Sequence, residues 1–362
     1  MDNPFLVEVT RGKLIESRHR GSVSVVDAEG ATVLSIGDVD RRVFPRSAVK
    51  ALQAMPLVES GIADKYGLTD AEIALACASH SGEPEHAATA QAMLTKAGRD
   101  VGCLECGVHW PMGEAANRAL AATGGSPSAL HNNCSGKHAG FVCLACGQGQ
   151  NPKGYVLADH PVQRSVREAL EEITGACHTV EKSGIDGCSI PTYAIPLPSL
   201  AFGFARFGTG SGLPGDGKAA AARIRRAVAR HPFMVAGTGR FDTKLMELLG
   251  ERAFVKVGAE GVYCASLPEL GYGVALKAED GNGRAAEAMM AGLVLRFLSL
   301  DTDERRAVEA LAQPVFKNWN GIEVGRIRVS SEIRGAGSSA GGPERGRPAE
   351  ARARHGTAGR GR

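Results

Sequence analysis

The sequence predicts a mixed α/β (α+β) fold, in which strands from both ends of the chain form one antiparallel sheet flanked by helices. Three observations predict this arrangement. Strand-type alternation fills the first 44 residues, helical periodicity runs from Pro45 to about residue 250, and strand patterns return after that point. No repeating strand–helix–strand unit is visible, so a parallel sheet is not expected.

Strand patterns occur at both ends of the chain. Near the N-terminus, turn formers such as AEG and GD separate four alternating segments, which read FLVEVT, KLIESRH, SVSVVD and TVLSIG. After residue 250, three further strand-type segments read AFVKV, GVYCASL and YGVALKA. Strands at both ends that enclose a helical middle favour one sheet built from both termini.

Helical periodicity fills the middle of the chain. The first segments read AVKALQAMPLVE, TDAEIALACA, PEHAATAQAMLTKAG and GEAANRALAA, and the later ones read VQRSVREALEEI, KAAAARIRRAVAR and TKLMELLG. Thr69 and Glu72 have the spacing of a capping box at a helix start. After the last strands, RAAEAMMAGLVLRFLSL and TDERRAVEALA also have helical periodicity.

The composition is that of a globular protein with a core of small side chains. Only 5% of the residues are aromatic although 43% are hydrophobic, so Ala, Val and Leu must fill most of the interior. The N-terminus has no apolar signal region and no eighteen apolar residues run together, so we expect a cytoplasmic protein without a membrane partner. The nine cysteines are an odd number, which favours reduced thiols or metal ligands over a disulfide framework.

The net charge of +3 is concentrated at the C-terminus. From Ile333 onward there are seven Arg and two Glu, which contribute +5, so residues 1–332 carry −2 and we expect no nucleic-acid partner. This Gly-, Ala- and Arg-rich tail has almost nothing to bury. We therefore expect a single folded domain over residues 1–330 and a disordered tail over 331–362, either a solvated extension or a basic arm for acidic partners.

Ser47 and Lys50 form the first candidate catalytic pair. They lie in PRSAVKALQ, where an extended segment gives way to a helix, so the hydroxyl and the amine lie one turn apart. A lysine can act as the base for a serine only when its amine is neutral, which at pH 7 costs about 4.6 kcal/mol unless burial or another cation lowers its pKa. The alternative is a serine at a helix N-terminus followed by a solvated lysine.

Two further segments complete a pattern typical of serine β-lactamase-type enzymes. These enzymes place SxxK on a helix, a hydroxyl group on a middle loop and K[ST]G on an edge strand. Here Ser79 lies in CASHSGEP after a helix, and Lys256 precedes Gly258 in the strand FVKVG. Taken alone, Lys256 fits a solvent-facing strand residue better and Ser79 fits an ordinary loop residue better. Their order along the chain and their element types together favour catalysis.

A second cluster has the residue types of a zinc site. Cys134 lies at the start of a helix in HNNCSGKHAGF, and Cys188 lies beside Asp186 in the loop SGIDGCSIP. Two thiolates with one nitrogen or oxygen ligand would leave a tetrahedral site open to water. His138 is the more ordinary nitrogen ligand and Lys137 the unusual one, because its amine must be neutral to bind a metal.

Two CxxC pairs are weaker metal candidates. Cys143 and Cys146 lie in the apolar run AGFVCLACG, which favours buried, unreactive thiols on a helix. Cys103 and Cys106 lie in VGCLECGVHW, where a loop and the edge of the core are both compatible with the sequence.

Several long strings resemble one enzyme family. PRSAVKALQAMPLVESG, CASHSGEPEH, HNNCSGKHAGF, SGIDGCSIPTYAIPL, HPFMVAGTGRFDT and VKVGAEGVY are similar to the L-asparaginase family typified by the inducible rhizobial enzyme. The similarity runs from about residue 5 to about residue 330. It implies a serine β-lactamase-like fold, hydrolysis of L-asparagine to L-aspartate and ammonia, and a homodimer.

The same resemblance implies a role for each residue at a matching position. Ser47 would be the nucleophile and Lys50 its base, with a β-aspartyl acyl-enzyme as the intermediate. Ser79 and Lys256 would form a second pair that relays a proton, and backbone N–H groups at Ser47 and after Lys256 would hold the oxyanion. The implied ligands of one zinc ion per chain are Cys134, Lys137 and Cys188, with Asp186 acting through a water.

The amino-acid head of the substrate needs a cation for its carboxylate and an acceptor for its ammonium. Arg46, His138, Arg240 and Asp242 are candidates, although Arg240 and Asp242 are also compatible with a surface salt bridge. Two alternatives use the same residues. One is a glutaminase or another β-lactamase-like acyl hydrolase, and the other is a non-catalytic, zinc-dependent amino-acid sensor.

Overall fold

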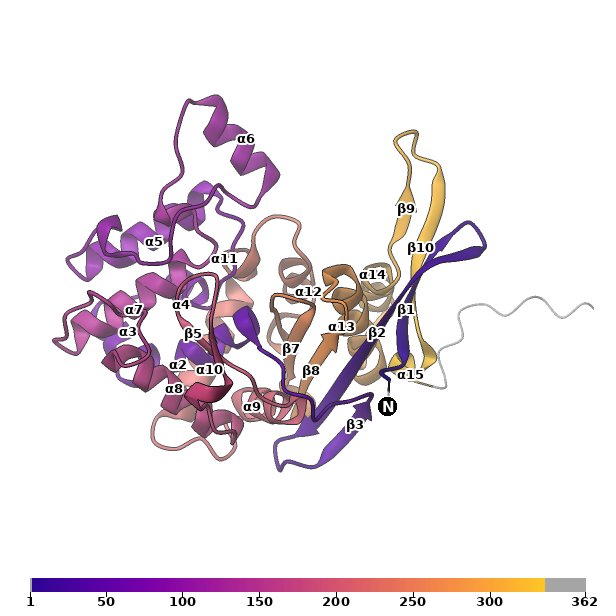
Figure 1. The fold of residues 1–362 in the computed structure, drawn as a ribbon, viewed down its shortest axis with the longest axis horizontal. Coiled ribbons are helices and arrows are strands. Elements are labelled where there is room, and N and C mark those ends of the chain that lie inside the picture. The colour runs from indigo at the N-terminus through magenta and orange to yellow at the C-terminus, as the bar shows by residue number, and fades with distance from the viewer. Residues whose placement is uncertain (1, 336–362) are drawn as a thin grey trace, which may run out of the picture.

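The computed structural model describes residues 2–335, which contain one antiparallel sheet (Figure 1). Its strand order is β6-β7-β8-β2-β1-β10-β9, and β3 pairs with β2. The strands are β1 (Phe5–Arg11), β2 (Leu14–Asp27), β3 (Thr32–Ile36), β6 (Phe254–Val257), β7 (Val262–Leu267), β8 (Tyr272–Ala278), β9 (Val315–Lys317) and β10 (Glu323–Val329). The predicted sheet built from both termini is confirmed, since the N-terminal strand β2 pairs with β8.

The strands differ from the prediction at two places. The expected strands KLIESRH and SVSVVD are one 14-residue strand, β2, which pairs with β1 through its first half and with β8 and β3 through its second half. The strands β9 and β10 were not predicted. Both differences affect how the sheet is assembled. The long strand β2 joins β1 to β8, and β10 covers the outer edge of β1.

Helices cover both faces of the sheet. Helix α9 (Leu197–Thr209) packs on β2, β7 and β8, and α13 (Gly283–Phe297) packs on the opposite face together with α14 (Thr302–Ala312). The approach of α9 requires Gly273, because a Cβ there would lie 1.8 Å from the backbone oxygen of Ala201. Small side chains fill the core as predicted; α13 alone buries four alanines.

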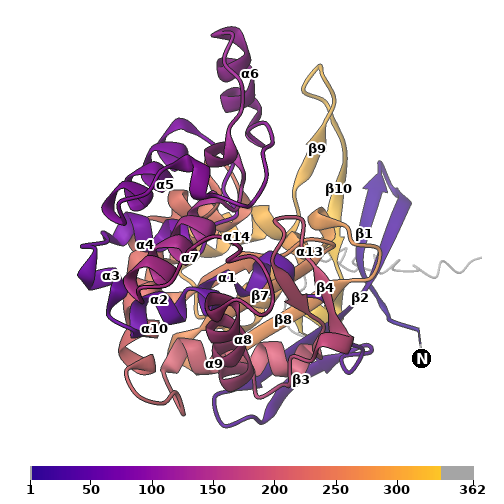
Figure 2. The ribbon, with the colours of Figure 1, turned by 60° about the vertical axis from the view of Figure 1, so that its left-hand side comes forward.

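The remaining helices form a layer beside the β6 end of the sheet (Figures 1 and 2). They are α1 (Lys50–Gln53), α2 (Met55–Glu59), α3 (Ile62–Lys65), α4 (Asp70–Ala76), α5 (Pro84–Lys96), α6 (Glu114–Ala122), α7 (Ser135–Gly147), α8 (Pro161–Thr174), α10 (Gly217–Arg230), α11 (Pro232–Ala236) and α12 (Phe241–Leu249). The capping box of Thr69 and Glu72 is confirmed. A short hairpin of β4 (Ser183–Ile185) and β5 (Pro191–Tyr193) carries Asp186 and Cys188 in its turn.

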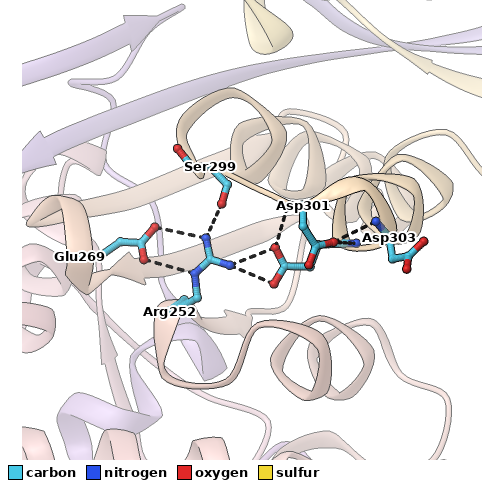
Figure 3. Close-up of polar contacts among 6 residues, drawn as sticks. Arg252, Glu269, Ser299, Asp301 and Asp303 are labelled. Atoms are coloured by element: carbon cyan, nitrogen blue, oxygen red, sulfur yellow. Dashed lines mark hydrogen bonds and ion pairs between the residues drawn. The ribbon is translucent and has the colours of Figure 1, made fainter.

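An arginine network fixes the start of β6 (Figure 3). Arg252, in the turn η5 (Gly250–Arg252), donates to both carboxylate oxygens of Glu304 at 2.9 and 3.0 Å and to Glu269 at 3.2 Å. Glu269 lies between β7 and β8, and Glu304 lies in the first turn of α14, which Asp301 caps. The network thus joins three elements two residues before the strand that carries Lys256.

The C-terminal boundary differs slightly from the prediction. Residues 331–335, which we expected in the disordered tail, include the short helix α15 (Ser331–Arg334), and Ile333 is fully buried. The rest of the predicted tail, residues 336–362, lies outside the described residues. Within residues 2–335, no helix has the length and apolar character needed to cross a membrane.

Candidate active site

Ser47 lies where the sheet meets the helical layer. It belongs to the short 3-10 turn η1 (Arg46–Val49), which contacts β6 and β7 and leads directly into α1. A Cβ on Gly258 would lie 2.6 Å from the backbone oxygen of Pro45, so the glycine of the KxG pattern lets the end of β6 approach this turn. Ser47 is half-buried and therefore remains reachable from solvent.

Lys50 is fully buried, which excludes the solvated alternative. Its Nζ donates to the backbone oxygen of Ala78 at 2.5 Å, to Ser79 Oγ at 2.8 Å and to Cys134 Sγ at 3.1 Å. Among the described residues, the Ser47 hydroxyl is not a hydrogen-bond partner of this amine. The structure therefore joins Lys50 to the second candidate serine and to the cysteine cluster.

Lys256 is also fully buried, so it is not the solvent-facing residue that an edge strand allows. Its Nζ donates to the backbone oxygen of Val257 at 3.0 Å and lies 3.8 Å from Asp242 Oδ2. Burial lowers the pKa of Lys256 to about 7; the Asp242 carboxylate opposes this shift, and the nearby Lys50 adds to it. No hydrogen bond joins Lys256 to Ser79 in the part of the chain that the structure describes.

The two thiols and Lys137 lie together in the interior. Cys134, Lys137 and Cys188 are each at most 5% exposed, and Lys137 Nζ donates to Cys188 Sγ at 2.9 Å. The Cys188 thiol and the two lysine amines hold the pKa of Cys134 well below its usual range despite its burial. Burial acts to lower the pKa of Lys137, but the two sulfurs outweigh it and raise the pKa overall.

Asp186 connects this cluster to the turn that carries Ser47. Its Oδ1 accepts a hydrogen bond from Arg46 Nε at 2.5 Å, and its carboxylate is almost entirely buried. Burial acts to raise the pKa of Asp186, but the Lys137 and Arg46 cations lower it overall. Arg46 has a left-handed backbone with φ of +52°, an uncommon conformation for a non-glycine residue.

His138, on α7, is fully buried, so we do not expect its side chain to contact the substrate directly. Its Nδ1 lies 2.6 Å from the Tyr155 hydroxyl, which itself accepts a hydrogen bond from the Glu105 N–H at 2.9 Å. The Tyr155 hydroxyl thus contacts both the His138 ring and the Glu105 backbone. The sequence favoured His138 over Lys137 beside the cysteines; in the structure Lys137 reaches Cys188 and His138 reaches Tyr155, a partner that no pattern in the sequence singled out.

A metal ion bound by Cys134 and Cys188 would need Lys137 as its third ligand. No group of three His, Cys, Asp or Glu side chains within residues 2–335 is placed to hold a metal. Cys134, Cys188 and Lys137 nevertheless bring two sulfurs and an amine together in a buried site, a donor set that suits a soft divalent cation once the amine is neutral. The CxxC pairs do not compete, because Cys143 is buried with a pKa raised by burial to about 12.

Asp242 and Arg240 do not form the surface salt bridge that the sequence allows. Asp242 is 1% exposed, pairs with Lys256 and accepts the Val257 N–H through Oδ2 at 3.2 Å. Arg240 precedes α12 and is half-buried, and its guanidinium has no hydrogen-bond or ion-pair partner among residues 2–335. Of the four candidates for substrate binding, Arg240 alone keeps its charge free within that range.

Two of the N–H groups after Lys256 are already occupied. The Val257 N–H donates to Asp242, and the Gly258 N–H donates to the backbone oxygen of Val262 at 2.8 Å. The next donor, the Ala259 N–H, has no hydrogen-bond acceptor within residues 2–335, so the expectation of an oxyanion donor after Lys256 stays a prediction that rests on this group. At Ser47, the second residue of its turn, no backbone acceptor for the N–H occurs in the described chain, so this donor stays available.

Comparison with known proteins identifies one family. The family model of L-asparaginase II matches residues 7–329. No curated protein matches the chain.

Several solved structures resemble it weakly. A structure of Mglu in its native form shares 15% identity over 74% of this chain and 61% of that chain, with a TM-score of 0.33. A structure of Mglu in its glutamate form shares 15% identity over 78% of this chain and 62% of that chain, with a TM-score of 0.33. A structure of a putative beta-lactamase from Bacteroides dorei DSM 17855 shares 14% identity over 73% of this chain and 86% of that chain, with a TM-score of 0.34. The chain thus spans about three fifths of the Mglu structures, and likenesses this weak indicate neither substrate nor mechanism.

Proposed function

Because the chain belongs to the L-asparaginase II family, we propose that it hydrolyses L-asparagine to L-aspartate and ammonia through a serine acyl-enzyme. The observation that carries this proposal is the fully buried Lys50 amine, three residues from Ser47 and 2.8 Å from Ser79 Oγ. A buried lysine destabilises a fold unless it is partnered or used in chemistry, and the partners of Lys50 include a serine hydroxyl. A serine β-lactamase-like fold accompanies this proposal.

Ser47 serves as the nucleophile because it is the more accessible of the two serines. In the proposed reaction, Lys50 first gives up one of the three protons that it donates to Ala78, Ser79 and Cys134. The neutral amine then takes the Ser47 proton, the oxygen attacks the side-chain carbonyl carbon of asparagine, and the Ser47 N–H stabilises the oxyanion. The carbon–nitrogen bond then breaks, and Lys50 returns its proton to the departing ammonia through Ser79. Water hydrolyses the β-aspartyl ester by the reverse proton path.

Arg240 is the preferred cation for the α-carboxylate of the substrate. Arg46, His138 and Asp242 are engaged by Asp186, Tyr155 and Lys256, whereas the Arg240 guanidinium is free in the described chain. Its charge also acts on Asp242 and Lys256, which places it near the site. Removal of Arg240 should therefore raise KM more than it lowers kcat.

Zinc is the metal that the cluster of Cys134, Lys137 and Cys188 would hold, with Asp186 acting through a water. When bound, the ion would supply the positive charge that stabilises the thiolates and orders the β4–β5 turn. Without it, the ammonium of Lys137 fulfils part of this task through its 2.9 Å contact with Cys188. The proposed chemistry at Ser47 uses only side chains and backbone groups of the protein.

Two alternatives keep the same residues. A glutaminase or another β-lactamase-like acyl hydrolase would use the serines and lysines on a different substrate, and a zinc-dependent sensor would bind the amino acid without turnover. The buried Lys50 and Lys256 disfavour the sensor, since a protein that only binds gains nothing from keeping both. A homodimer in the cytoplasm remains our proposal for the assembled protein, to be checked by light scattering of the purified chain.

The deciding experiment is ammonia release from L-asparagine and L-glutamine by the wild type and by Ser47→Ala, with zinc quantified in both. We expect asparagine-selective release that Ser47→Ala abolishes while it retains its zinc, and an aspartyl adduct on the Ser47 peptide of the quenched wild type. A preference for glutamine would support the glutaminase. Asparagine binding without release by zinc-loaded wild type would support the sensor.

A further inference from the structure

A cavity with charged side chains in its lining lies next to Arg46, the residue that precedes Ser47. It has a volume of about 320 Å³. Ser22, Lys277 and Val262 form its floor, because they are register partners on β2, β8 and β7. The segment between β3 and η1, which includes Arg42, forms one wall. The cavity has room for a small organic ligand rather than for water alone.

Opposite charges face this cavity without being paired to each other. Lys277 is half-buried, and its Nζ donates only to the backbone oxygens of Ala278 and Glu279. Arg42 donates to the backbone oxygen of Ala194 at 3.2 Å. Within residues 2–335, neither cation forms an ion pair with a carboxylate, and Glu260, in the turn between β6 and β7, has no ion-pair or hydrogen-bond partner.

The separation of these charges indicates the kind of ligand. Glu260 attracts Lys277 but does not contact it, which leaves space between a carboxylate and an ammonium group. A molecule that carries a carboxylate and an ammonium of its own would pair with both sides at once. The two cations offer partners for two acceptor groups of one ligand, a carboxylate and either a second carboxylate or a carboxamide. The Asp38 carboxylate, which accepts the Arg41 N–H at 3.2 Å, also lines the cavity.

Backbone strain supports a binding role. Arg46, with φ of +52°, and Glu260, with φ of +56°, are two of the three non-glycine residues in the described chain with positive φ, and both line this cavity. Such strain is typical of ligand clamps and active sites. Arg46 is also the wall shared with the proposed active site, through its hydrogen bond to Asp186.

We propose that this cavity is a second binding site for a small zwitterion, an α-amino acid of the aspartate or asparagine type. Lys277 and Arg42 bind its carboxylates, and Glu260 binds its ammonium group. The site is separate from the chemistry, since neither Lys277 nor Glu260 belongs to the proposed catalytic set. Binding of aspartate does not require turnover, so the proposal can fail or succeed independently of the proposed reaction.

The test uses a fluorescent reporter in the cavity wall. Phe44 lines the cavity and is 43% exposed, so Phe44→Trp introduces a local tryptophan, and the two natural tryptophans, Trp110 and Trp319, lie outside the lining. We expect a saturable change in the fluorescence of the introduced tryptophan on titration with L-aspartate. Addition of Glu260→Gln or Lys277→Met should weaken the apparent affinity at least tenfold, and circular dichroism confirms that each variant is folded.

Two controls decide between this cavity and the proposed active site. Arg240→Ala in the reporter background should leave the titration unchanged, because Arg240 does not line the cavity. Succinate, which lacks the ammonium group, should bind at least tenfold more weakly than aspartate. Any one of three results would overturn the proposal: loss of the fluorescence signal in Arg240→Ala, equal binding of succinate and aspartate, or unchanged aspartate affinity in Glu260→Gln. The Glu260 side chain is exposed and not needed for folding, so Glu260→Gln tests binding alone.

Discussion

At the residue scale, the two buried lysines are the most informative side chains. Lys50 contacts Ser79 and Cys134, and Lys256 lies 3.8 Å from Asp242, so each is held by a partner that is distant in sequence. Burial lowers the pKa of Lys256, and the charge of Lys50 lowers it further. Removal of these groups or their partners should therefore be measurable in turnover and in stability.

Ser79→Ala should slow the proposed reaction without removing the acyl-enzyme. The substitution takes away the hydroxyl that accepts the Lys50 proton at 2.8 Å, so we expect kcat to fall by about 10²–10⁴-fold, the usual range for proton transfer by a positioned group. Quenched turnover followed by peptide mass analysis should still find the aspartyl adduct on Ser47. An adduct that vanishes in Ser79→Ala and persists in Ser47→Ala would make Ser79 the nucleophile.

Lys256→Met should change how stability depends on pH. With a pKa of about 7 in the folded protein, against about 10.4 in an unfolded chain, Lys256 binds its proton more readily when unfolded. Burial of its charge therefore costs stability fully below pH 7, and this cost decreases as the pH rises toward 10. The unfolding free energy of Lys256→Met relative to wild type should fall by about 2 kcal/mol between pH 7 and pH 9.

Urea denaturation at pH 7, 8 and 9 measures this effect. Lys218→Met is the matched control because Lys218 is exposed on α10, so its difference from wild type should stay constant over this range. A flat difference for Lys256→Met as well would show that Lys256 is not neutralised in the folded protein.

Zinc removal should affect binding and order rather than the formation of the nucleophile. The cluster of Cys134, Cys188 and Lys137 is separated from Ser47 by Lys50, whose amine contacts Cys134 at 3.1 Å. We expect chelated protein to show a higher KM and faster amide exchange in residues 183–193, both restored by added zinc. Full turnover, affinity and exchange protection in metal-free protein would contradict a role for the ion.

The sequence identified these residues as candidates but did not predict which of their side chains contact one another. The spacing of Ser47 and Lys50 predicts that both side chains lie on one helical face, but the Lys50 amine turns into the core and contacts Ser79 and Cys134 instead of Ser47. The contact of His138 with Tyr155 could not be predicted, because the two residues lie on different elements and no motif joins them. Long-range side-chain contacts depend on packing that spacing along the chain does not encode.

At the element scale, propensity and close packing explain where the prediction failed. The expected helix over residues 48–59 is divided into η1, α1 and α2, because Pro56 has no N–H for the preceding turn. Helix α9 was missed because Gly203 and Gly208 lower its helix propensity; both are required by close neighbours, Thr174 and Ser266. Strand β10 was missed because three of its seven residues, EVGRIRV, are charged.

The Arg252 network yields a prediction at this scale (Figure 3). Arg252→Ala removes a bidentate contact to Glu304 and a contact to Glu269, and so loosens the start of β6 from α14. We expect a loss of about 1–3 kcal/mol in unfolding free energy, measured by urea denaturation at pH 7. Because β6 carries Lys256, kcat should also fall although Arg252 lies outside the site.

Arg326→Ala is the matched control for this variant. Its ion pair with Glu323 spans only three residues, and both side chains are about half exposed, so its removal should change stability by less than about 0.5 kcal/mol. Equal effects of the two variants would mean that the Arg252 network contributes no more than an exposed pair.

At the scale of the whole molecule, both chain ends belong to the same sheet that carries the site. Strands β1 and β10 pair directly, with Val7 opposite Val329 and Val9 opposite Ile327. The N-terminal strand β2 then connects this pair to β8, β7 and finally β6. The alternation at both ends predicted that β6, β7 and β8 share a sheet with the N-terminal strands, whereas the β1–β10 pair and the strand order were not predicted. The position of Lys256 therefore depends on strands at both termini.

Two truncations test where the folded unit ends. Deletion after residue 335 removes none of the described elements, so we expect an unchanged melting temperature and unchanged asparagine hydrolysis. Deletion after Ser330 also removes Ile333, which is fully buried, and the backbone oxygen of Glu332, which accepts from Arg296 at 2.7 Å. The lost burial alone is about 1.5–3 kcal/mol, which should lower the melting temperature by several degrees.

Because α15 packs on α13, which covers the sheet beneath β7 and β8, this loss should be accompanied by faster amide exchange in α13. Equal melting temperatures for the two truncations would mean that the chain beyond residue 330 adds nothing to the fold, as the sequence alone had predicted.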